Sequence, residues 1–133
     1  MFIDTCFYID LMREHCRKTA GPAKRKLLEL EFASINVPVF VLCELYAGAK
    51  GADNPHVELR KIEMFIENTE VIYPNESFAM LYGETEYLIR KRGHSVYAMD
   101  LLIGVLAKSY GQPVLTRNIK DFQKIPDLIV ETY

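Results

Sequence analysis

The sequence predicts an α/β protein in which a mainly parallel sheet of short strands carries helices on both faces. Short apolar stretches of strand length alternate with longer stretches of helical periodicity along the 133 residues. Consecutive parallel strands need a crossover connection of about a dozen residues or more, which a helix provides. With 50% hydrophobic and 26% charged residues, the composition is that of one globular domain, residues 1–133.

Two strand-and-helix units fill the first half of the chain. The Gly21-Pro22 pair breaks the helical pattern after the first helix, and a second helix follows it. Pro38 favours the first turn of the third helix, because no intrahelical hydrogen bond is lost there. The expected elements are strand, helix, helix, strand and helix at residues 2–4, 7–17, 24–32, 35–37 and 39–49.

The second half of the chain continues this alternation. Apolar residues three and four apart indicate a helix before the third strand. Gly93 and Gly111 are expected to end the next two helices, and the later of these is apolar almost all round, which indicates burial. A short helical turn is expected between the last two strands. The elements are helix, strand, two helices and two strands at residues 56–68, 71–73, 76–92, 98–110, 113–116 and 128–131.

Four carboxylates stand where core side chains would be expected. They lie within the segments MFID, VFVLCELYAGA, YAMDLLIGVLA and TRNIKDFQ. Burial of a carboxylate is costly unless a cation or hydrogen-bond donors compensate its charge. The repeated pattern therefore indicates one shared metal site, formed by Asp4, Glu44, Asp100 and Asp121.

The expected sheet brings these acids towards one edge. Sites in open parallel sheets form beyond the carboxyl ends of the strands, where Asp4 follows the first strand and Asp121 follows a later one. Asp100 lies in the first turn of its helix, where the helix dipole favours a negative charge. Clustered carboxylates repel one another unless a divalent cation binds them, and oxygen ligands select Mg²⁺ or Mn²⁺. We expect Asp4 and Asp100 to be metal ligands.

A site of this kind suits hydrolysis of a phosphodiester. A bound metal lowers the pKa of an attacking water and stabilises charge on the phosphate, so all four acids are candidate catalytic residues. Thr5 and Thr116 are candidates for hydroxyl contacts to a bound water, and Asn118 for orienting a ligand or a phosphate. Arg117 and Lys120 flank the last acid and are candidate contacts to a nucleic-acid backbone.

Composition narrows the function classes. A net charge of −2 gives no overall attraction for nucleic acid, so a polyanion must meet a local basic patch or metal ions. Three cysteines without a CxxC pair argue against a disulfide framework and a structural zinc site, and fit a reducing cytosol. No apolar run approaches the ~20 residues of a membrane span, and neither GxGxxG nor GxxxxGK[ST] occurs. We expect a cytoplasmic protein without membrane contact.

Four segments of the chain together resemble a known family. FIDTCFYIDL, CELYAGA, MDLLIGVLAKSYG and PVLTRNIKDFQKIPDL look like the successive motifs of PIN-domain proteins, most of all the VapC-type toxins of type II toxin–antitoxin modules. The resemblance implies a three-layer α/β/α fold and a Mg²⁺- or Mn²⁺-dependent endoribonuclease, whose acids would be Asp4, Glu44 and Asp100 with a fourth within TRNIKDF. It also implies an RNA substrate, a cognate antitoxin that covers the active site, and a homodimer or toxin–antitoxin hetero-oligomer.

Two positions depart from the family's pattern. Cys6 stands where the first motif often has Asn or Ser, which predicts the loss of a hydrogen bond near the metal. The family's fourth acid often follows the Thr-Arg pair directly, where this chain has Asn118. Either Asp121 substitutes from one helical turn further on, or the site works with three acids.

Structural roles are the alternative for individual acids. Asp4 before a helix is also a typical N-cap, Glu44 could face solvent from an amphipathic helix, and Asp121 could be a surface turn residue. The rival function is a PIN-like domain that has lost catalysis and binds RNA or protein. The departures at Cys6 and Asn118 motivate that alternative.

Overall fold

A single parallel sheet forms the centre of the molecule. The computed structural model describes residues 1–30 and 35–133. All neighbouring strands of the sheet are parallel, and their spatial order is third, second, first, fourth and fifth along the chain. The strands are β1 (Phe2–Ile3), β2 (Asn36–Pro38), β3 (Glu70–Ile72), β4 (Val114–Leu115) and β5 (Val130–Glu131).

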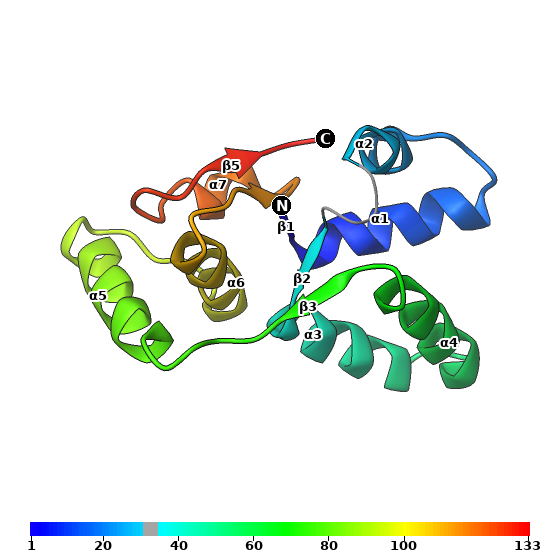
Figure 1. The fold of residues 1–133 in the computed structure, drawn as a ribbon, viewed down its shortest axis with the longest axis horizontal. Coiled ribbons are helices and arrows are strands. Elements are labelled where there is room, and N and C mark those ends of the chain that lie inside the picture. The colour runs from blue at the N-terminus through cyan, green and yellow to red at the C-terminus, as the bar shows by residue number, and fades with distance from the viewer. Residues whose placement is uncertain (31–34) are drawn as a thin grey trace.

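Helices flank this sheet on both sides. In the described residues they are α1 (Thr5–Cys16), α2 (Pro22–Leu30), α3 (Val39–Lys50), α4 (Pro55–Ile66), α5 (Phe78–Lys91), α6 (Ala98–Ser109) and α7 (Ile119–Phe122). Figure 1 shows α5 and α6 on one side of the strands and α1, α2 and α4 on the other. The predicted three-layer α/β/α class with a parallel sheet is confirmed.

The element order agrees with the sequence prediction, and the differences lie at element ends. The second helix begins earlier than expected, at Pro22, and the last two residues of its expected range lie outside the described residues. Pro38 was expected in the first turn of a helix, but it is the last residue of β2, with φ −54° and ψ 137°. A proline's fixed φ suits extended backbone as well as a helix start. The helix α3 itself begins at Val39, as predicted. Gly93 and Gly111 follow their helices with φ of 73° and 62°, as predicted for helix ends.

The most deeply buried helix, α6, positions the short helix α7. Its residues Leu101, Ile103, Val105 and Leu106 are at most 2% exposed. A Cβ atom at Gly104 would collide with Ile125 and would crowd the side chains of Leu128 and Phe122. The glycine therefore allows the segment that carries α7 to pack directly on α6.

The sheet register brings two strand ends together. The backbone N–H of Asp4, directly after β1, donates to the Leu115 carbonyl of β4 at 3.1 Å. Because the strands are parallel, Asp4 and Thr116 leave the sheet at the same edge, and both are buried. None of the helices in the described residues is long and apolar enough to cross a bilayer.

Candidate active site

Asp4 occupies the centre of this edge and is only 5% exposed. One carboxylate oxygen, Oδ1, accepts a hydrogen bond from the Thr5 backbone N–H at 2.6 Å, which caps α1. The other oxygen, Oδ2, accepts from Thr116 Oγ1 at 2.7 Å and from Cys6 Sγ at 3.0 Å. Asp4 therefore caps α1 and also lies at the candidate site. Three donors compensate its buried charge.

Cys6 donates a hydrogen bond to Asp4. Its departure from the family's first motif had predicted that a hydrogen bond would be missing here. Burial first, and then the charge of Asp4, raise the pKa of the thiol, so that it stays protonated and acts as a donor. The prediction of a missing hydrogen bond was wrong, because sulfur reaches the Asp4 carboxylate at a slightly longer distance than oxygen would. Thr116 is fully buried and also accepts from the Asn118 backbone N–H at 2.9 Å.

Glu44 reaches the site from α3 and is fixed by Thr5. The Thr5 hydroxyl donates to Glu44 Oε2 at 2.5 Å, while the Thr5 backbone N–H donates to Asp4. A single residue at the start of α1 therefore sets the relative positions of two carboxylates. The predicted contact of Thr5 with a bound water stays a prediction.

Asn118 lies between Asp100 and Asp121, the two acids on the later part of the chain. The Asn118 amide nitrogen donates to Asp100 Oδ2 at 2.9 Å and to Asp121 Oδ2 at 3.2 Å. The other oxygen of Asp121 accepts from Lys124 Nζ at 2.6 Å, and the same ammonium group donates to the Ser95 carbonyl at 2.9 Å. Asp121 thus lies at the rim of the site, joined to Asp100 through an amide.

Three neighbouring acids act on the electrostatics of Asp100. Burial, followed by the charges of Asp4, Asp121 and Glu44, raises the pKa of Asp100 to about 6. At the rim, hydrogen bonds from Lys124 and Asn118 lower the pKa of Asp121. Negative charge is therefore disfavoured at Asp100, on the first turn of α6.

The donor chemistry of the site fits a hard divalent cation. As placed, the described side chains include no group of three or more His, Cys, Asp or Glu residues that already forms a metal shell. The converging groups are nevertheless carboxylates, and a cation would offset the burial and the repulsion that raise the pKa of Asp100. Asp4 and Asp100 remain the candidate ligands, with Glu44 and Asp121 beside them.

The two predicted phosphate contacts lie outside the acids. The Arg117 guanidinium pairs with Asp10 at 2.7 Å, while the Arg117 backbone N–H donates to Cys6 Sγ at 3.3 Å. Lys120 is exposed, and its charge helps to lower the pKa of Asp121.

Tyr133 belongs to this surrounding network although sequence reasoning missed it. Its hydroxyl donates to Asp10 at 2.8 Å and to Cys6 at 3.7 Å. The sequence predicts Asp10 to be a solvated or ion-paired helix residue; it is ion-paired, with a side chain only 12% exposed. A contact across 123 positions of sequence leaves no local pattern that could reveal it.

Comparison with known proteins identifies the family. The PIN domain family matches residues 1–128. The chain belongs to the PIN-domain family. This PIN domain is 38% identical over 85 residues to ribonuclease VapC1 of Haemophilus influenzae, a region that covers 64% of this chain and 63% of that protein. The match thus spans slightly less than two thirds of that relative's length.

Two further proteins resemble the PIN domain over more of its length. The tRNA(fMet)-specific endonuclease VapC of Salmonella typhimurium is 28% identical over 109 residues, covering 82% of this chain and 83% of that protein. The crystal structure of VapBC2 from Rickettsia felis, bound to a DNA fragment from its promoter, superposes with a TM-score of 0.87. It is 25% identical and covers 99% of this chain and 97% of that chain.

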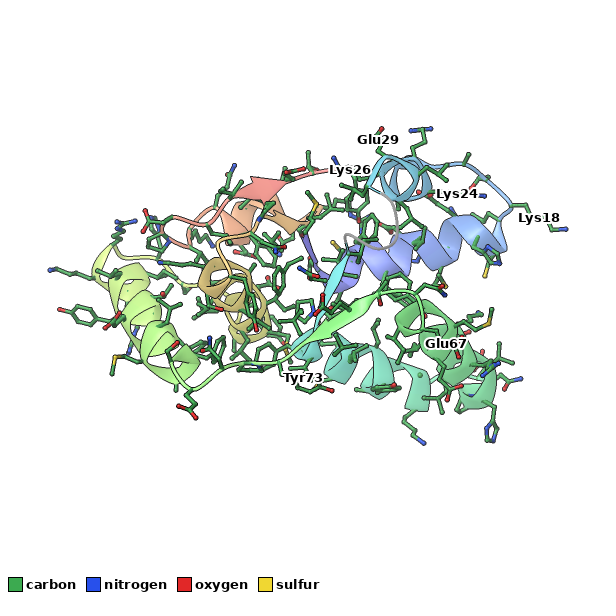
Figure 2. All side chains as sticks on the ribbon, viewed as in Figure 1. Lys18, Lys24, Lys26, Glu29, Glu67 and Tyr73 are labelled. Carbon is green, nitrogen blue, oxygen red and sulfur yellow. The ribbon has the colours of Figure 1, made fainter. Side chains whose placement is uncertain are left out.

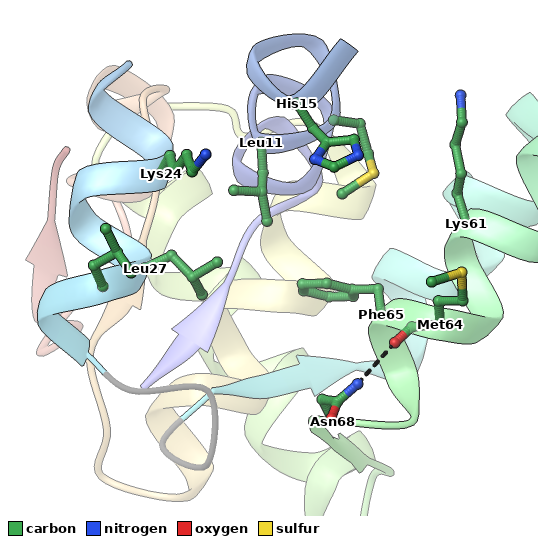
Figure 3. A pocket seen from close by; sticks show the side chains of 10 residues that line it. Leu11, His15, Lys24, Leu27, Lys61, Met64, Phe65 and Asn68 are labelled. Carbon is green, nitrogen blue, oxygen red and sulfur yellow. Dashed lines mark hydrogen bonds between the residues drawn. The ribbon is translucent and has the colours of Figure 1, made fainter. Parts of the chain in front are cut away.

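The PIN domain also has an apolar cavity of about 360 Å³ away from the acids. It lies between α1, α2 and α4, as Figure 3 shows, and no predicted site residue lines it. Leu11, Leu27 and Phe65 form its floor, and the exposed side chains of Leu28 and Met64 border it. A large exposed apolar surface of this kind is typical of a binding site for a partner.

Proposed function

We propose that this PIN-domain protein is a Mg²⁺- or Mn²⁺-dependent endoribonuclease and the toxin of a type II toxin–antitoxin module in the cytosol. The observation that carries the proposal is a cluster of hydrogen-bonded acids, in which Thr5 contacts both Asp4 and Glu44, and Asn118 joins Asp100 to Asp121. Such a cluster at the carboxyl edge of a parallel sheet is costly without a cation. The names of the Haemophilus and Salmonella relatives, a ribonuclease and a tRNA-specific endonuclease, support RNA as the substrate.

In this proposal the surrounding residues hold the acids in place before substrate arrives. Asp4 and Asp100 would hold the metal, with Glu44 and Asp121 beside them. When bound, the metal supplies an activated water and stabilises charge on the phosphate and the leaving oxygen. Thr116 and Cys6 fix one oxygen of Asp4, Thr5 fixes Glu44, and Asn118 sets Asp100 relative to Asp121. Fixing these groups in advance lowers the cost of ordering them during the reaction.

The partner in this proposal is an antitoxin that docks an amphipathic helix into the apolar cavity. The Rickettsia neighbour is a VapBC2 complex, which supports such a partner. Leu28 and Met64 are 71% and 56% exposed at the cavity and would be covered by an apolar helix face. Of the residues that the structure describes, His15, Lys24 and Lys61 line the cavity and no carboxylate does, so acidic residues on the partner would be complementary.

The rival function, a PIN-like binding module without catalysis, loses part of its motivation. It rested on the departures at Cys6 and Asn118, yet Cys6 donates to Asp4 and Asn118 joins two acids. Both residues therefore contribute hydrogen bonds to the candidate site. Cleavage of RNA distinguishes the two functions, because a binding module would bind RNA or protein without cleaving RNA.

The decisive experiment is cleavage of a labelled single-stranded RNA by the purified protein with Mg²⁺ or Mn²⁺ and with EDTA. We expect cleavage with either metal, none with EDTA, and only background cleavage by Asp4→Asn and Asp100→Asn. Asp127→Asn is the matched control, because Asp127 is 90% exposed in its side chain and remote from the site. RNA binding without cleavage would favour the binding module, and metal-independent cleavage would contradict the proposed chemistry.

A further inference from the structure

A second cavity, of about 320 Å³, lies next to the acidic site. It is formed by α1, the turn that follows it, and the segment after β4. Three guanidinium groups border it, from Arg13, Arg17 and Arg117. The carboxylates that border it belong to Asp10 and Glu14.

The positive charge of this cavity is only partly compensated. Asp10 forms ion pairs with two of the arginines, at 2.7 Å from Arg117 and 3.6 Å from Arg13. These two arginine side chains remain 60% and 62% exposed. Arg17 is exposed, and it forms no ion pair with any carboxylate of residues 1–30 or 35–133.

Both carboxylates of the cavity are already committed to other groups. Asp10 accepts the Tyr133 hydroxyl at 2.8 Å in addition to its arginines. Glu14 accepts the backbone N–H groups of Ala23 at 3.1 Å and Lys24 at 2.8 Å, at the start of α2. The two acids therefore fix the walls of the cavity, and guanidinium groups are left to meet an incoming anion. Figure 2 shows Lys18 beyond the end of α1 and Lys24 and Lys26 on α2, and none of these three lysines lines this cavity.

Hydrogen bonds through Cys6 connect Arg117, at this cavity, with Asp4 in the acidic site. The Arg117 backbone N–H donates to Cys6 Sγ at 3.3 Å, and Cys6 donates to Asp4 at 3.0 Å. A nucleic-acid strand with one phosphate at the acids would therefore bring a neighbouring phosphate close to the arginines. Guanidinium groups suit this ligand because their paired N–H donors match phosphate oxygens.

We propose that this cavity is a phosphate-binding subsite for the RNA strand, which holds a phosphate next to the one that is cleaved. The inference rests on the proposed ribonuclease function and deepens it. Arg13, Arg17 and Arg117 bind the phosphate, and the Tyr133–Asp10 pair keeps Arg117 oriented towards the cavity. Binding of this kind is to the backbone and carries no base specificity.

Binding of a labelled single-stranded RNA tests the subsite, measured over a range of salt concentrations in the Asp100→Asn background so that no RNA is cleaved. Arg13→Ala/Arg17→Ala is expected to bind about tenfold more weakly, with a salt slope reduced by about 0.7 for each phosphate that the variant no longer neutralises. Arg13→Lys/Arg17→Lys should keep most of the slope and lose part of the affinity. Arg90→Ala is the control, because Arg90 is 67% exposed on α5 and pairs with Glu86.

With the acids intact, the double alanine variant should raise KM for RNA and leave kcat within about twofold, since the arginines hold this phosphate equally strongly in the ground and transition states.

Affinity and salt slope equal to those of Arg90→Ala would overturn the subsite while leaving the nuclease proposal standing. An equal loss of binding to a polyglutamate peptide would indicate a site for acidic protein segments instead. Absence of RNA binding and cleavage by the unsubstituted protein would overturn both proposals.

Discussion

The side-chain nitrogen of Asn118 lies 2.9 Å from Asp100 Oδ2 and 3.2 Å from Asp121 Oδ2, so one amide joins two acids of the site. The residue after the Thr-Arg pair is therefore a hydrogen-bond donor in this chain, in a place where the family often has a carboxylate. A donor there stabilises the ionised form of Asp100 and lowers its pKa, against the effect of burial and of three neighbouring charges.

Replacement of this amide should impair the site without unfolding the protein. In Asn118→Ala, Asp100 loses its donor, and we expect its pKa to rise further and activity to fall about 10- to 100-fold, as for other residues that orient metal ligands. Comparison of kcat/KM with that of Gln123→Ala, at an exposed position that ends α7, provides the measurement and its control. Equal activity of the two variants would show that Asn118 does not position Asp100.

Protonation of Asp100 should stabilise the metal-free protein. Its pKa is about 6 in the folded chain against an ordinary value of 3.8, so the folded state binds the proton more tightly than the unfolded state. Stability from this group is therefore present at low pH and lost as pH rises from about 4 to about 6. We expect Asp100→Asn to have a higher Tm than the unsubstituted protein at pH 7 in EDTA, and the difference to shrink towards pH 4.

Bound metal should reverse the order of these two Tm values at pH 7, so that the unsubstituted protein becomes the more stable one. Mn²⁺ is expected to raise the Tm of the unsubstituted protein and to act much less on Asp100→Asn, because a cation that binds only the folded state stabilises it. Below pH 6 the gain should fall, since the cation must displace a proton. A lower Tm for Asp100→Asn than for the unsubstituted protein in EDTA at pH 7 would contradict the raised pKa that burial and the neighbouring acids give Asp100.

The thiol of Cys6 should matter as a hydrogen-bond donor. Cys6→Ser keeps a donor beside Asp4 and is expected to stay within about threefold of full activity, whereas Cys6→Ala should lose about 10-fold or more. The alanine variant should also lose about 1 kcal/mol in the free energy of unfolding, from urea titrations. Cys16→Ala, at an exposed cysteine, is the control and should change neither quantity. Equal behaviour of the serine and alanine variants would show that the hydrogen bond to Asp4 contributes nothing to either quantity.

The tight contact at Gly104 predicts opposite effects of alanine at two helical glycines. Gly83, on α5, has open space around it, so Gly83→Ala should raise stability by up to about 1 kcal/mol through helix propensity. Gly104→Ala should lower stability by about 1 kcal/mol or more, because the new methyl group meets Ile125 and crowds Leu128. Thermal denaturation of both variants gives the sign, and a stabilising Gly104→Ala would show that the α6 to α7 contact is loose.

The apolar cavity between α1, α2 and α4 predicts separable binding and cleavage. Met64→Glu places a charge in the apolar surface and should abolish co-purification with the antitoxin while leaving RNA cleavage in place. Met80→Glu is the matched control, because Met80 is 73% exposed on α5, outside the cavity. Retained complex formation by Met64→Glu would place the partner elsewhere on the surface.

The sequence by itself was enough to predict the alternating elements and three acids of the site. Strand-length apolar runs and helix-length periodicity are local signals, and they determine the parallel sheet because crossover connections leave few alternatives. Asp4, Glu44 and Asp100 were recognisable because a carboxylate inside an apolar stretch is energetically costly. Their catalytic and metal-binding roles stay predictions.

The tertiary structure decided everything that depends on contacts between distant segments. It showed that Cys6 restores a hydrogen bond to Asp4, that Asn118 joins Asp100 to Asp121, and that Tyr133 reaches Asp10. It also showed two distinct cavities, one bordered by arginines and one apolar. Hydrogen bonds depend on distances of about 3 Å between side-chain atoms, and such distances follow from packing across the sheet rather than from any local pattern.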